Sequence, residues 1–348
     1  MRRKLLEVLA DPLTGEPLEL VGDRGDDPVE SGELVSPSSG RRYPIVGGVP
    51  RFVPGQDYSA SFGLQWNKFS RVQLDSATGA SYSRRRFDRE TGWTADELAG
   101  TWVVDAGCGT GRFAEIAASY GAEVIALDLS SAVDAAQRNL GHRPNVHVVQ
   151  GDLRHLPLRA EAISFLYSIG VLQHTPDPIG ATRHLVEFLP QGARYAFTIY
   201  SYKPWTKLYS KYWVRPLTTR MRPDRLLKGI EAVMPVAFPV TSALFPLPAL
   251  GKVFQFVIPV ANYVDHTDLS RELRYQEAVM DTFDMLAPAY DRPVSAEAVE
   301  TALAPLSDRV TFVSRVPVMV QGVRSAPVHP PAGEEPSGSR GPARRSSH

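Results

Sequence analysis

The stretch Val103–Phe113 decides the fold, and it reads Val-Val-Asp-Ala-Gly-Cys-Gly-Thr-Gly-Arg-Phe. Apolar β-branched residues lead to an acid, and three alternating glycines then lead into a helical pattern. Glycine permits a tight turn with positive φ, and its missing side chain lets a ligand lie against the backbone. The segment therefore predicts a buried strand, a ligand-binding turn and a helix. Its G-x-G-x-G spacing departs from the G-x-G-x-x-G of dinucleotide enzymes, which disfavours NAD and a dehydrogenase.

Strand-like and helix-like segments alternate around this stretch. The expected strands are Trp102–Asp105, Glu123–Leu127, Val146–Gln150, Ala162–Tyr167 and Arg194–Tyr200. The expected helices lie between them at about 112–119, 130–140 and 178–188. Such alternation predicts right-handed β-α-β crossovers, and hence an α/β, Rossmann-like fold with a mostly parallel sheet.

The remaining chain divides into flanking regions of different composition. In order, we expect a small β-rich module, a helical cofactor lid, the Rossmann-like core, an inserted acceptor lid, a terminal β-hairpin of the core and a disordered tail. Their expected limits are residues 1–54, 55–100, 101–200, 201–308, 309–324 and 325–348. The insertion is too long for a connecting loop, and the tail has almost no large apolar residues.

Acidic residues follow three successive expected strands. Asp105 ends the first strand, Asp128 ends the second, and Asp152 follows the third. Open α/β sheets bind ligands at the carboxyl ends of their strands, so the three acids point to one crevice. We expect Asp105 to accept from a ligand ammonium, directly or through water, Asp128 to accept from ribose hydroxyls and Asp152 to accept from an adenine amino group.

These motifs and the segment Tyr167–Asp177 resemble those of class I S-adenosylmethionine-dependent methyltransferases. The resemblance covers about residues 100–200 and implies a seven-stranded sheet that ends in the terminal hairpin. It implies S-adenosylmethionine as the cofactor and S-adenosylhomocysteine as the product. The cofactor residues that it implies or that the pattern suggests are Asp105, Gly107, Cys108, Gly109, Gly111, Asp128, Leu129, Asp152, Leu153, Ser168, Gln65 and Trp66.

The flanking regions resemble a bacterial subgroup often found with biosynthetic genes. Phe62–Phe69 and Asp281–Asp291 carry this resemblance, which implies that the aromatic helix folds over the cofactor. Residues 1–54 resemble the small zinc-ribbon module related to the activator subunit of tRNA and protein methyltransferases. The four cysteine positions of that module read Asp11, Thr14, Ser36 and Ser39 here. Serine and threonine are poor zinc ligands, so we expect the fold without a metal.

Histidines are the candidate general bases at the acceptor, because a hydroxyl or carbon acid usually needs one. His174 follows the fourth strand, where the family often has two histidines and this chain has Gln173-His174; a bystander role beside the cofactor is as well supported. His266, in the insertion, is the weaker candidate. The residues that could position the acceptor are Gln173, Tyr200, Arg271, Arg274, Tyr275, Asp284 and Tyr290.

Composition limits the partners. The chain has 38 Lys and Arg residues and 38 Asp and Glu residues, so its net charge is zero. It therefore has no overall positive electrostatic field to attract nucleic acid or an anionic membrane. The apolar stretch Val233–Val264 is divided by prolines, which favours short buried or lid helices over a membrane span. The basic and aromatic stretch 200–228 is better explained by an amphipathic lid helix than by a nucleic-acid site. We expect a cytoplasmic protein with a small-molecule acceptor, and leave a homo-oligomer open.

The combined hypothesis is a methyltransferase of a small biosynthetic metabolite, with O-methylation of a carboxylate or hydroxyl ahead of C- or N-methylation. A tRNA or protein methyltransferase is the alternative that the N-terminal module suggests. A cofactor-binding scaffold without turnover is the alternative from another class.

Overall fold

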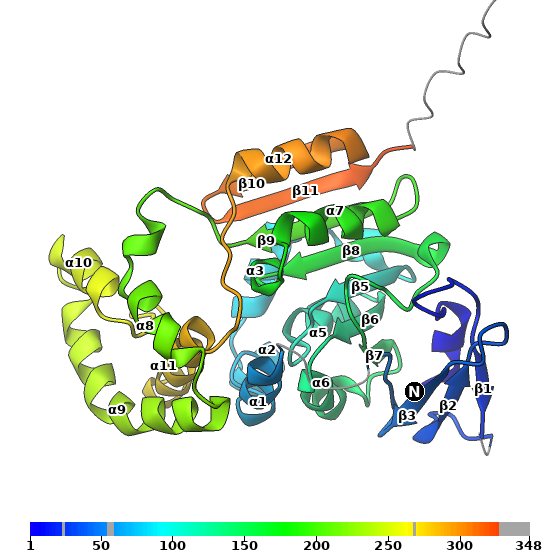
Figure 1. Ribbon diagram of the computed structural model, residues 1–348, viewed down its shortest axis with the longest axis horizontal. Coiled ribbons are helices and arrows are strands. Elements are labelled where there is room, and N and C mark those ends of the chain that lie inside the picture. Colours follow the sequence, from blue (N-terminus) through cyan, green and yellow to red (C-terminus); the bar gives the residue numbers. More distant parts are fainter. Residues whose placement is uncertain (23–24, 54–58, 267–268, 327–348) are drawn as a thin grey trace, which may run out of the picture.

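Two sheets and a helical insertion follow one another across the computed structural model (Figure 1). The structure describes residues 1–22, 25–53, 59–266 and 269–326. The small N-terminal sheet lies at one end, the large sheet in the middle, and helices α8 to α11 at the opposite end. Most of the expected tail, from residue 327 onward, lies outside the described residues.

The large sheet has the order β10-β11-β9-β8-β5-β6-β7. Its strands are β5 (Trp102–Ala106), β6 (Glu123–Asp128), β7 (Val146–Gln150), β8 (Ile163–Ile169), β9 (Arg194–Ile199), β10 (Ser307–Arg315) and β11 (Val318–Arg324). The first five pair in parallel, while β11 is antiparallel to both β9 and β10. The Rossmann-like sheet and its terminal hairpin are therefore confirmed.

Helices cover both faces of this sheet, because alternate residues of its strands point to opposite sides. Val103 belongs to the buried cluster that includes Phe113, whereas Val104 belongs to the cluster that includes Leu185. One face packs against α3 (Tyr82–Thr91), α5 (Arg112–Ser119) and α6 (Ala132–Leu140). The other lies under α7 (Pro178–Phe188) and α12 (Ala296–Leu303), which are seen together in Figure 1. The short helical segments are η1 (Arg3–Glu7), α2 (Asp75–Thr78), α4 (Ala95–Leu98), η2 (Ala160–Ala162), η3 (Leu172–His174), η4 (Thr206–Leu208) and η5 (Ala304–Leu306).

The N-terminal sheet is antiparallel throughout and docks on the edge of the large one. Its strands are β1 (Glu19–Val21), β2 (Ser31–Val35), β3 (Arg42–Val46) and β4 (Val49–Pro50). Just after β4, the Phe52 N–H donates to the Gln150 carbonyl at 2.8 Å. Leu5 and Leu9 join the same buried cluster as Val104. The module thus covers the β7 edge, which would otherwise expose unpaired backbone groups.

Asp11, Thr14, Ser36 and Ser39 lie together in a hydrogen-bonded turn region. The buried Asp11 carboxylate accepts from the N–H groups of Leu13 at 2.8 Å and Thr14 at 3.2 Å. The Ser39 hydroxyl donates to Ser36 Oγ at 2.9 Å and lies 3.4 Å from Asp11 Oδ2. Among the described residues, no group of three or more His, Cys, Asp or Glu side chains is placed to hold a metal ion.

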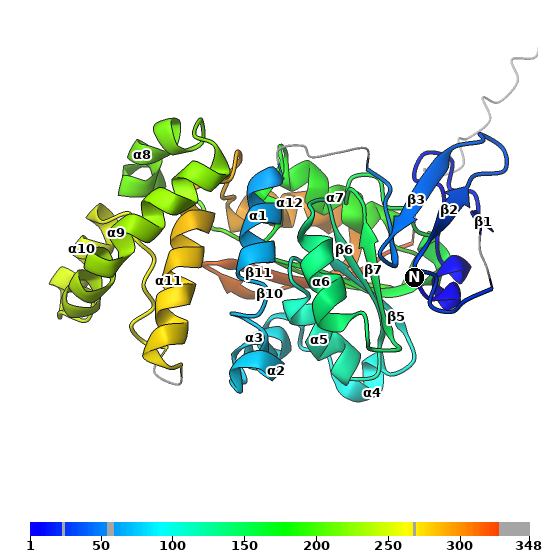
Figure 2. The same ribbon diagram turned by 90° about the horizontal axis from the view of Figure 1, so that it is seen from below.

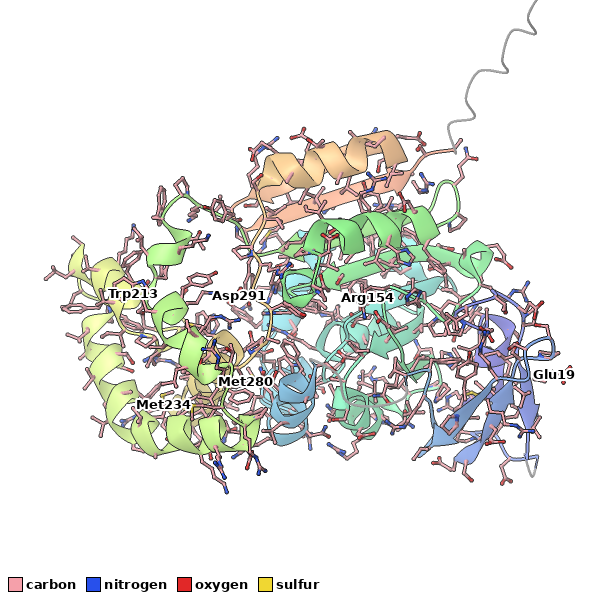
Figure 3. The ribbon with its side chains drawn as sticks, viewed as in Figure 1. Glu19, Arg154, Trp213, Met234, Met280 and Asp291 are labelled. Carbon is pink, nitrogen blue, oxygen red and sulfur yellow. The ribbon has the colours of Figure 1, made fainter. Side chains whose placement is uncertain are left out.

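The insertion contains α8 (Ser210–Thr218), α9 (Pro223–Leu244), α10 (Leu250–Val257) and α11 (Arg271–Leu286). The expectation of short helices divided by prolines is wrong for α9, whose 22 residues continue through Pro235 and Pro239. Figure 1 shows this helix bending, as proline inside a helix commonly causes. Met234 and Met280, labelled in Figure 3, belong to the buried cluster between α9 and α11. Within the described residues, α9 is the one helix long and apolar enough to cross a membrane, with 33% of that window buried.

Candidate cofactor and acceptor site

A cavity of about 480 Å³ lies at the carboxyl ends of β5, β6 and β8. It is closed on other sides by α1 (Ala60–Lys68) and by residues of the insertion. Of the residues predicted from sequence, those that line it are Trp66, Gly107, Cys108, Gly109, Asp128, Leu129, Asp152, Leu153, His174, Tyr200 and Asp284. Its size is that of a small-molecule or cofactor site.

The glycine loop has a conformation and surroundings that exclude side chains. Gly107 has φ +94°, and a Cβ there would lie 2.5 Å from Val171 Cγ1. Gly111 has φ +88°, and its Cβ would lie 2.4 Å from Leu140 Cδ1, on the packing side of the loop. Because Gly107 has no side chain, a ligand in the cavity can approach its backbone closely. Gly111 does not line the cavity, and its missing side chain lets α5 and α6 pack together.

Asp128 is held at the cavity wall by neighbouring donors. Its Oδ2 accepts from the Gly109 N–H at 2.9 Å, and its Oδ1 accepts from the Ser130 N–H and hydroxyl at 2.8 and 2.7 Å. Burial raises the pKa of Asp128, and these hydrogen bonds oppose the rise. Its Oδ2 can still accept a further hydrogen bond, so the residue fits a ligand that carries hydroxyls.

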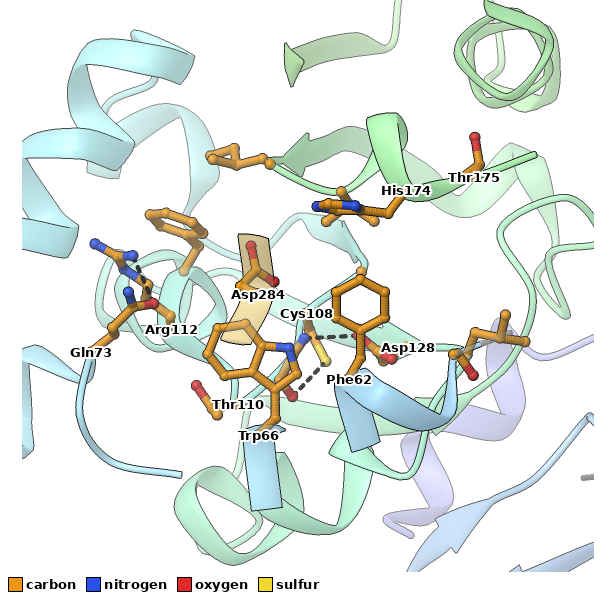
Figure 4. A pocket seen from close by; sticks show the side chains of 18 of the residues that line it. Phe62, Trp66, Gln73, Cys108, Thr110, Arg112, Asp128, His174, Thr175 and Asp284 are labelled. Atoms are coloured by element: carbon orange, nitrogen blue, oxygen red, sulfur yellow. Dashed lines mark hydrogen bonds between the residues drawn. The ribbon is translucent and has the colours of Figure 1, made fainter. Parts of the chain in front are cut away.

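Aromatic rings and a second acid complete this half of the cavity. The Trp66 indole nitrogen lies 3.3 Å from the position that a Gly109 Cβ would occupy, so the ring covers the loop. In Figure 4 the Phe62 and Trp66 side chains, both from α1, border the cavity near Asp128. Asp152 also lines the cavity, but its carboxylate already accepts from the Arg154 guanidinium at 2.6 Å.

Asp105 and Ser168 lie behind the cavity wall rather than in it. Asp105 is 2% exposed, and burial raises its pKa to about 8, against the effect of the neighbouring Tyr167 hydroxyl. The Ser168 hydroxyl donates to the Ala106 carbonyl at 2.7 Å and so joins β8 to β5. The expectation that Asp105 contacts a ligand directly is therefore not supported, because its side chain points into the sheet's packed side.

Polar residues that the sequence did not single out also line the cavity, among them Gln73, Arg86 and Arg112. Arg112 donates to Gln73 Oε1 and to Ser83 Oγ, both at 2.9 Å. Burial lowers the pKa of Arg112 to about 10, which leaves the guanidinium charged at neutral pH. Arg112 directly follows the last loop glycine, so its position in the motif was the signal that could have identified it.

His174 stands at the other half of the cavity, with a fixed tautomer. Its Nδ1 lies 2.9 Å from the Tyr290 carbonyl oxygen. A carbonyl only accepts, so Nδ1 carries the hydrogen, and in the neutral ring Nε2 has the free lone pair. The ring is held between Phe62 and Tyr200, at centroid distances of 5.1 and 5.7 Å.

Three carboxyl groups from the insertion and the following segment line the same half: Asp281, Asp284 and Asp291. Burial, with the charges of Glu277 and Asp284, raises the pKa of Asp281 well above its usual range. Burial also raises the pKa of Asp284. Asp291 differs, because Lys211 donates to its Oδ2 at 2.7 Å and lowers its pKa in spite of burial.

The other predicted acceptor residues lie outside this cavity. His266 is buried, with its Nδ1 2.9 Å from Glu277 Oε2, and it does not line the cavity. Arg271 and Tyr275 line a separate hollow against α9, and Arg274 stacks over Phe238 on α9. On α11 these three residues lie two or three turns before the acids that reach the cavity, so the structure does not bring them to it, and their role as acceptor residues stays a prediction.

Three predicted residues are adjacent to the cavity without lining it. Tyr290 contributes its backbone carbonyl to His174, while its ring lies under Arg292. The Gln173 amide donates to the Gly170 carbonyl at 2.6 Å, which leaves its oxygen without a partner. The Gln65 amide is 1% exposed, and neither of its polar atoms has a hydrogen-bond partner.

Comparison with known proteins agrees with this geometry. Residues 104–197 match the family model described as a methyltransferase domain. This part of the chain is a methyltransferase domain. It is of the S-adenosylmethionine-dependent type, and the glycine loop, Asp128 and the aromatic cover fit that cofactor. Residues 2–48 match the model described as Trm112p-like protein, which confirms the kinship of the N-terminal module.

The curated relatives are similar at low identity. A malonyl-[acyl-carrier protein] O-methyltransferase of Enterobacter lignolyticus (strain SCF1) is 27% identical over 214 residues, covering 57% of this chain and 79% of that one. A ubiquinone biosynthesis O-methyltransferase of Acinetobacter baumannii (strain AYE) is 27% identical over 122 residues, or 33% of this chain. This chain thus spans about half, 51%, of the length of the Acinetobacter relative.

Among solved structures, an S-adenosylmethionine-dependent methyltransferase from Mesorhizobium loti is 30% identical, with a TM-score of 0.28. The match covers 30% of this chain and 48% of that one. A complex of the Haloferax volcanii Trm112 activator with a methyltransferase is 12% identical, with a TM-score of 0.39. That match covers 76% of this chain and 98% of the other.

Proposed function

We propose that this protein transfers the methyl group of S-adenosylmethionine to a hydroxyl oxygen of a small-molecule metabolite in a biosynthetic pathway. The observation that carries the proposal is His174, whose free Nε2 stands in the half of the cavity opposite the glycine loop and Asp128. When bound, S-adenosylmethionine supplies a methyl group on a positively charged sulfur. A hydroxyl that attacks this carbon must lose its proton, and a neutral imidazole suits that task near neutral pH.

The tertiary contacts of His174 support the role of general base. The Tyr290 carbonyl keeps the hydrogen on Nδ1, so Nε2 can receive the acceptor's proton. The resulting imidazolium would stand near the Asp284 carboxyl, and the positive charge of His174 lowers the pKa of that carboxyl. A carboxylate acceptor would need no base, and the histidine would then have no task.

The charges around the acceptor also favour a hydroxyl over a carboxylate. Asp281, Asp284 and Asp291 line this half of the cavity, and of these Asp291 is paired, with Lys211. An anionic acceptor would enter beside these groups and meet repulsion or force their protonation. A neutral or amine-bearing alcohol would instead find acceptors there.

For the cofactor, we propose that the glycine loop lies under its methionine part and that Asp128 accepts from the ribose hydroxyls. Leu153 and Asp152 would border the adenine. Arg112 and Arg86 would face the carboxylate of the methionine part, because they are the cations on that side of the cavity. Trp66 would exclude water from the reacting atoms.

The N-terminal module suggests a second candidate, a macromolecular acceptor, because residues 2–48 match the Trm112p-like family. Its position favours a structural role here. The module covers the β7 edge, whereas the insertion and its acids lie at the opposite end of the sheet (Figure 1). We further propose that the module folds without metal, and that the hydrogen-bonded side chains of Asp11, Ser36 and Ser39 take the place of zinc.

The test is a transfer assay with S-adenosylmethionine labelled in its methyl group and an extract of the source cells. Label in the small-molecule fraction that resists mild base supports the hydroxyl proposal. Base-labile label would indicate a methyl ester and contradict it. Label in the RNA or protein fraction would favour the second candidate. Binding of S-adenosylhomocysteine without label in any fraction would indicate a scaffold or an extract that lacks the acceptor.

A further inference from the structure

The outermost helices of the insertion, α9 and α10, carry apolar side chains that stay exposed among the residues that the structure describes. Val233, Val236 and Val240 follow the spacing of one helix face on α9 and are 61%, 69% and 46% exposed. Leu250, Val253 and Val257 repeat the same spacing on α10. These six residues, here termed the outer face, are all exposed.

The opposite side of α9 already supplies the packing that the fold needs. Leu226, Ile230, Met234 and Phe238 are buried against α11 in one cluster. The outer face is therefore additional to the core. From Ala232 to Ile258 the sequence holds one charged residue, Lys252. Exposed apolar side chains gathered on one helix face commonly mark a surface that meets a partner.

Exposed cations stand on the same two helices as this apolar surface. Residues 201–262 carry nine Lys and Arg residues against two acids, Asp224 and Glu231, although two of the nine point inward: Lys211 pairs with Asp291 at the cavity, and Arg215 is buried. Arg225, Lys228 and Lys252 are exposed, and none of them has an ion-pair partner within the described ranges. Exposed tryptophan accompanies them, since Trp213 on α8 is 66% exposed (Figure 3).

We propose that the outer face docks on the surface of an anionic lipid bilayer. Helices that lie in a membrane interface combine an apolar face with flanking Lys, Arg and Trp, and that combination is present here. A second copy of the chain is a poorer occupant. A twofold interface would bring the same patch against itself and oppose its unpaired cations. The expectation of no membrane partner rested on the net charge of zero, which conceals the local excess of cations in residues 201–262.

The proposal does not depend on the acceptor or on turnover, so its test measures binding alone. The full chain is sedimented with vesicles of phosphatidylcholine and with vesicles of phosphatidylcholine plus phosphatidylglycerol. We expect binding to the anionic vesicles, and weaker binding as salt is raised. Removing the three cations together (R225Q, K228Q, K252Q) should weaken it on the order of 100-fold.

A second variant tests the apolar contact. Val236→Asp with Val253→Asp places charges on the outer face and should abolish vesicle binding. The matched control, Val46→Asp with Val316→Asp, changes exposed valines elsewhere and should leave it intact. Equal binding to both vesicle types, or unchanged binding of the outer-face variant, would overturn the proposal. So would a dimer in analytical ultracentrifugation that the outer-face variant alone dissociates, because the occupant would then be a second copy.

Discussion

His174 Nδ1 lies 2.9 Å from the backbone carbonyl oxygen of Tyr290, which is 116 positions away in the chain. The contact ties the segment after β8 to the segment after α11, and both segments border the acceptor half of the cavity. It also presents Nε2, rather than Nδ1, as the basic nitrogen. A backbone partner can supply this orientation whatever side chain stands at position 290.

Replacement of His174 by alanine should lower turnover by about 10²- to 10⁴-fold, the usual contribution of a general base. Affinity for S-adenosylhomocysteine, measured by calorimetry, should stay within a few-fold, because the residue stands on the acceptor side. The exposed His142→Ala is the control. Near-normal turnover of the His174 variant would exclude the base and support a bystander role.

Asp128→Ala should weaken cofactor binding by about 1–3 kcal/mol, which is the cost of polar groups left without partners. The Gly109 N–H and the Ser130 hydroxyl lose their acceptor together with the cofactor's hydroxyls. Titration calorimetry with S-adenosylhomocysteine measures the loss, with the exposed Asp308→Asn as the control. Unchanged affinity would remove the ribose assignment.

Asp284→Asn should raise KM for the acceptor by about 10- to 100-fold, since it removes a charged hydrogen-bond acceptor from the cavity wall. Cofactor affinity should be unaffected. The comparison variant is Asp308→Asn, as for Asp128. If acceptor KM stays constant while cofactor affinity falls, the acid belongs to the cofactor half and the division of the cavity proposed above is wrong.

Asp105 should make the protein less stable as pH rises. Burial raises its folded-state pKa to about 8, whereas the unfolded carboxyl titrates near its ordinary value of about 4. Between these values the folded state binds more protons, so the free energy of unfolding falls with pH, by at most about 1.4 kcal/mol per pH unit from this group. Denaturant unfolding at about pH 5 and about pH 8 should show Asp105→Asn gaining stability relative to wild type at the higher pH. A pH-independent difference would contradict the assignment.

The N-terminal module should be insensitive to metal removal. Burial raises the pKa of Asp11, but the hydrogen bonds that its carboxylate accepts, those from the N–H groups of Leu13 and Thr14 foremost, together lower it by more. The net pKa is therefore lowered, which keeps the carboxylate charged. Treatment with EDTA should leave Tm unchanged, whereas Asp11→Ala should cost about 1–3 kcal/mol of unfolding free energy by leaving those donors unpaired. A fall in Tm with EDTA that added zinc restores would show a metal site after all.

The Rossmann-like core could be predicted because its signals are local. Val103–Phe113 combines a buried strand with glycines that only a tight turn requires, and its acids recur at strand ends. Apolar residues that recur every two residues then predict the strands, and apolar residues that recur every 3.6 residues predict the helices. For the same reason the sequence predicts Gly107, Gly109, Asp128 and Asp152 in one crevice, and all four line the cavity.

The acceptor half depended on tertiary structure. Asp281 and Asp284 face the cavity, while Arg271 and Tyr275 on the same helix face another hollow, because helix position and rotation decide which turn reaches the site. The sequence by itself determined the sheet, the glycine loop and the strand-end acids, whose causes lie within a few residues. Only the tertiary structure decided the pairing of His174 with Tyr290 and the cationic, apolar outer end, since these depend on packing between segments distant in the chain.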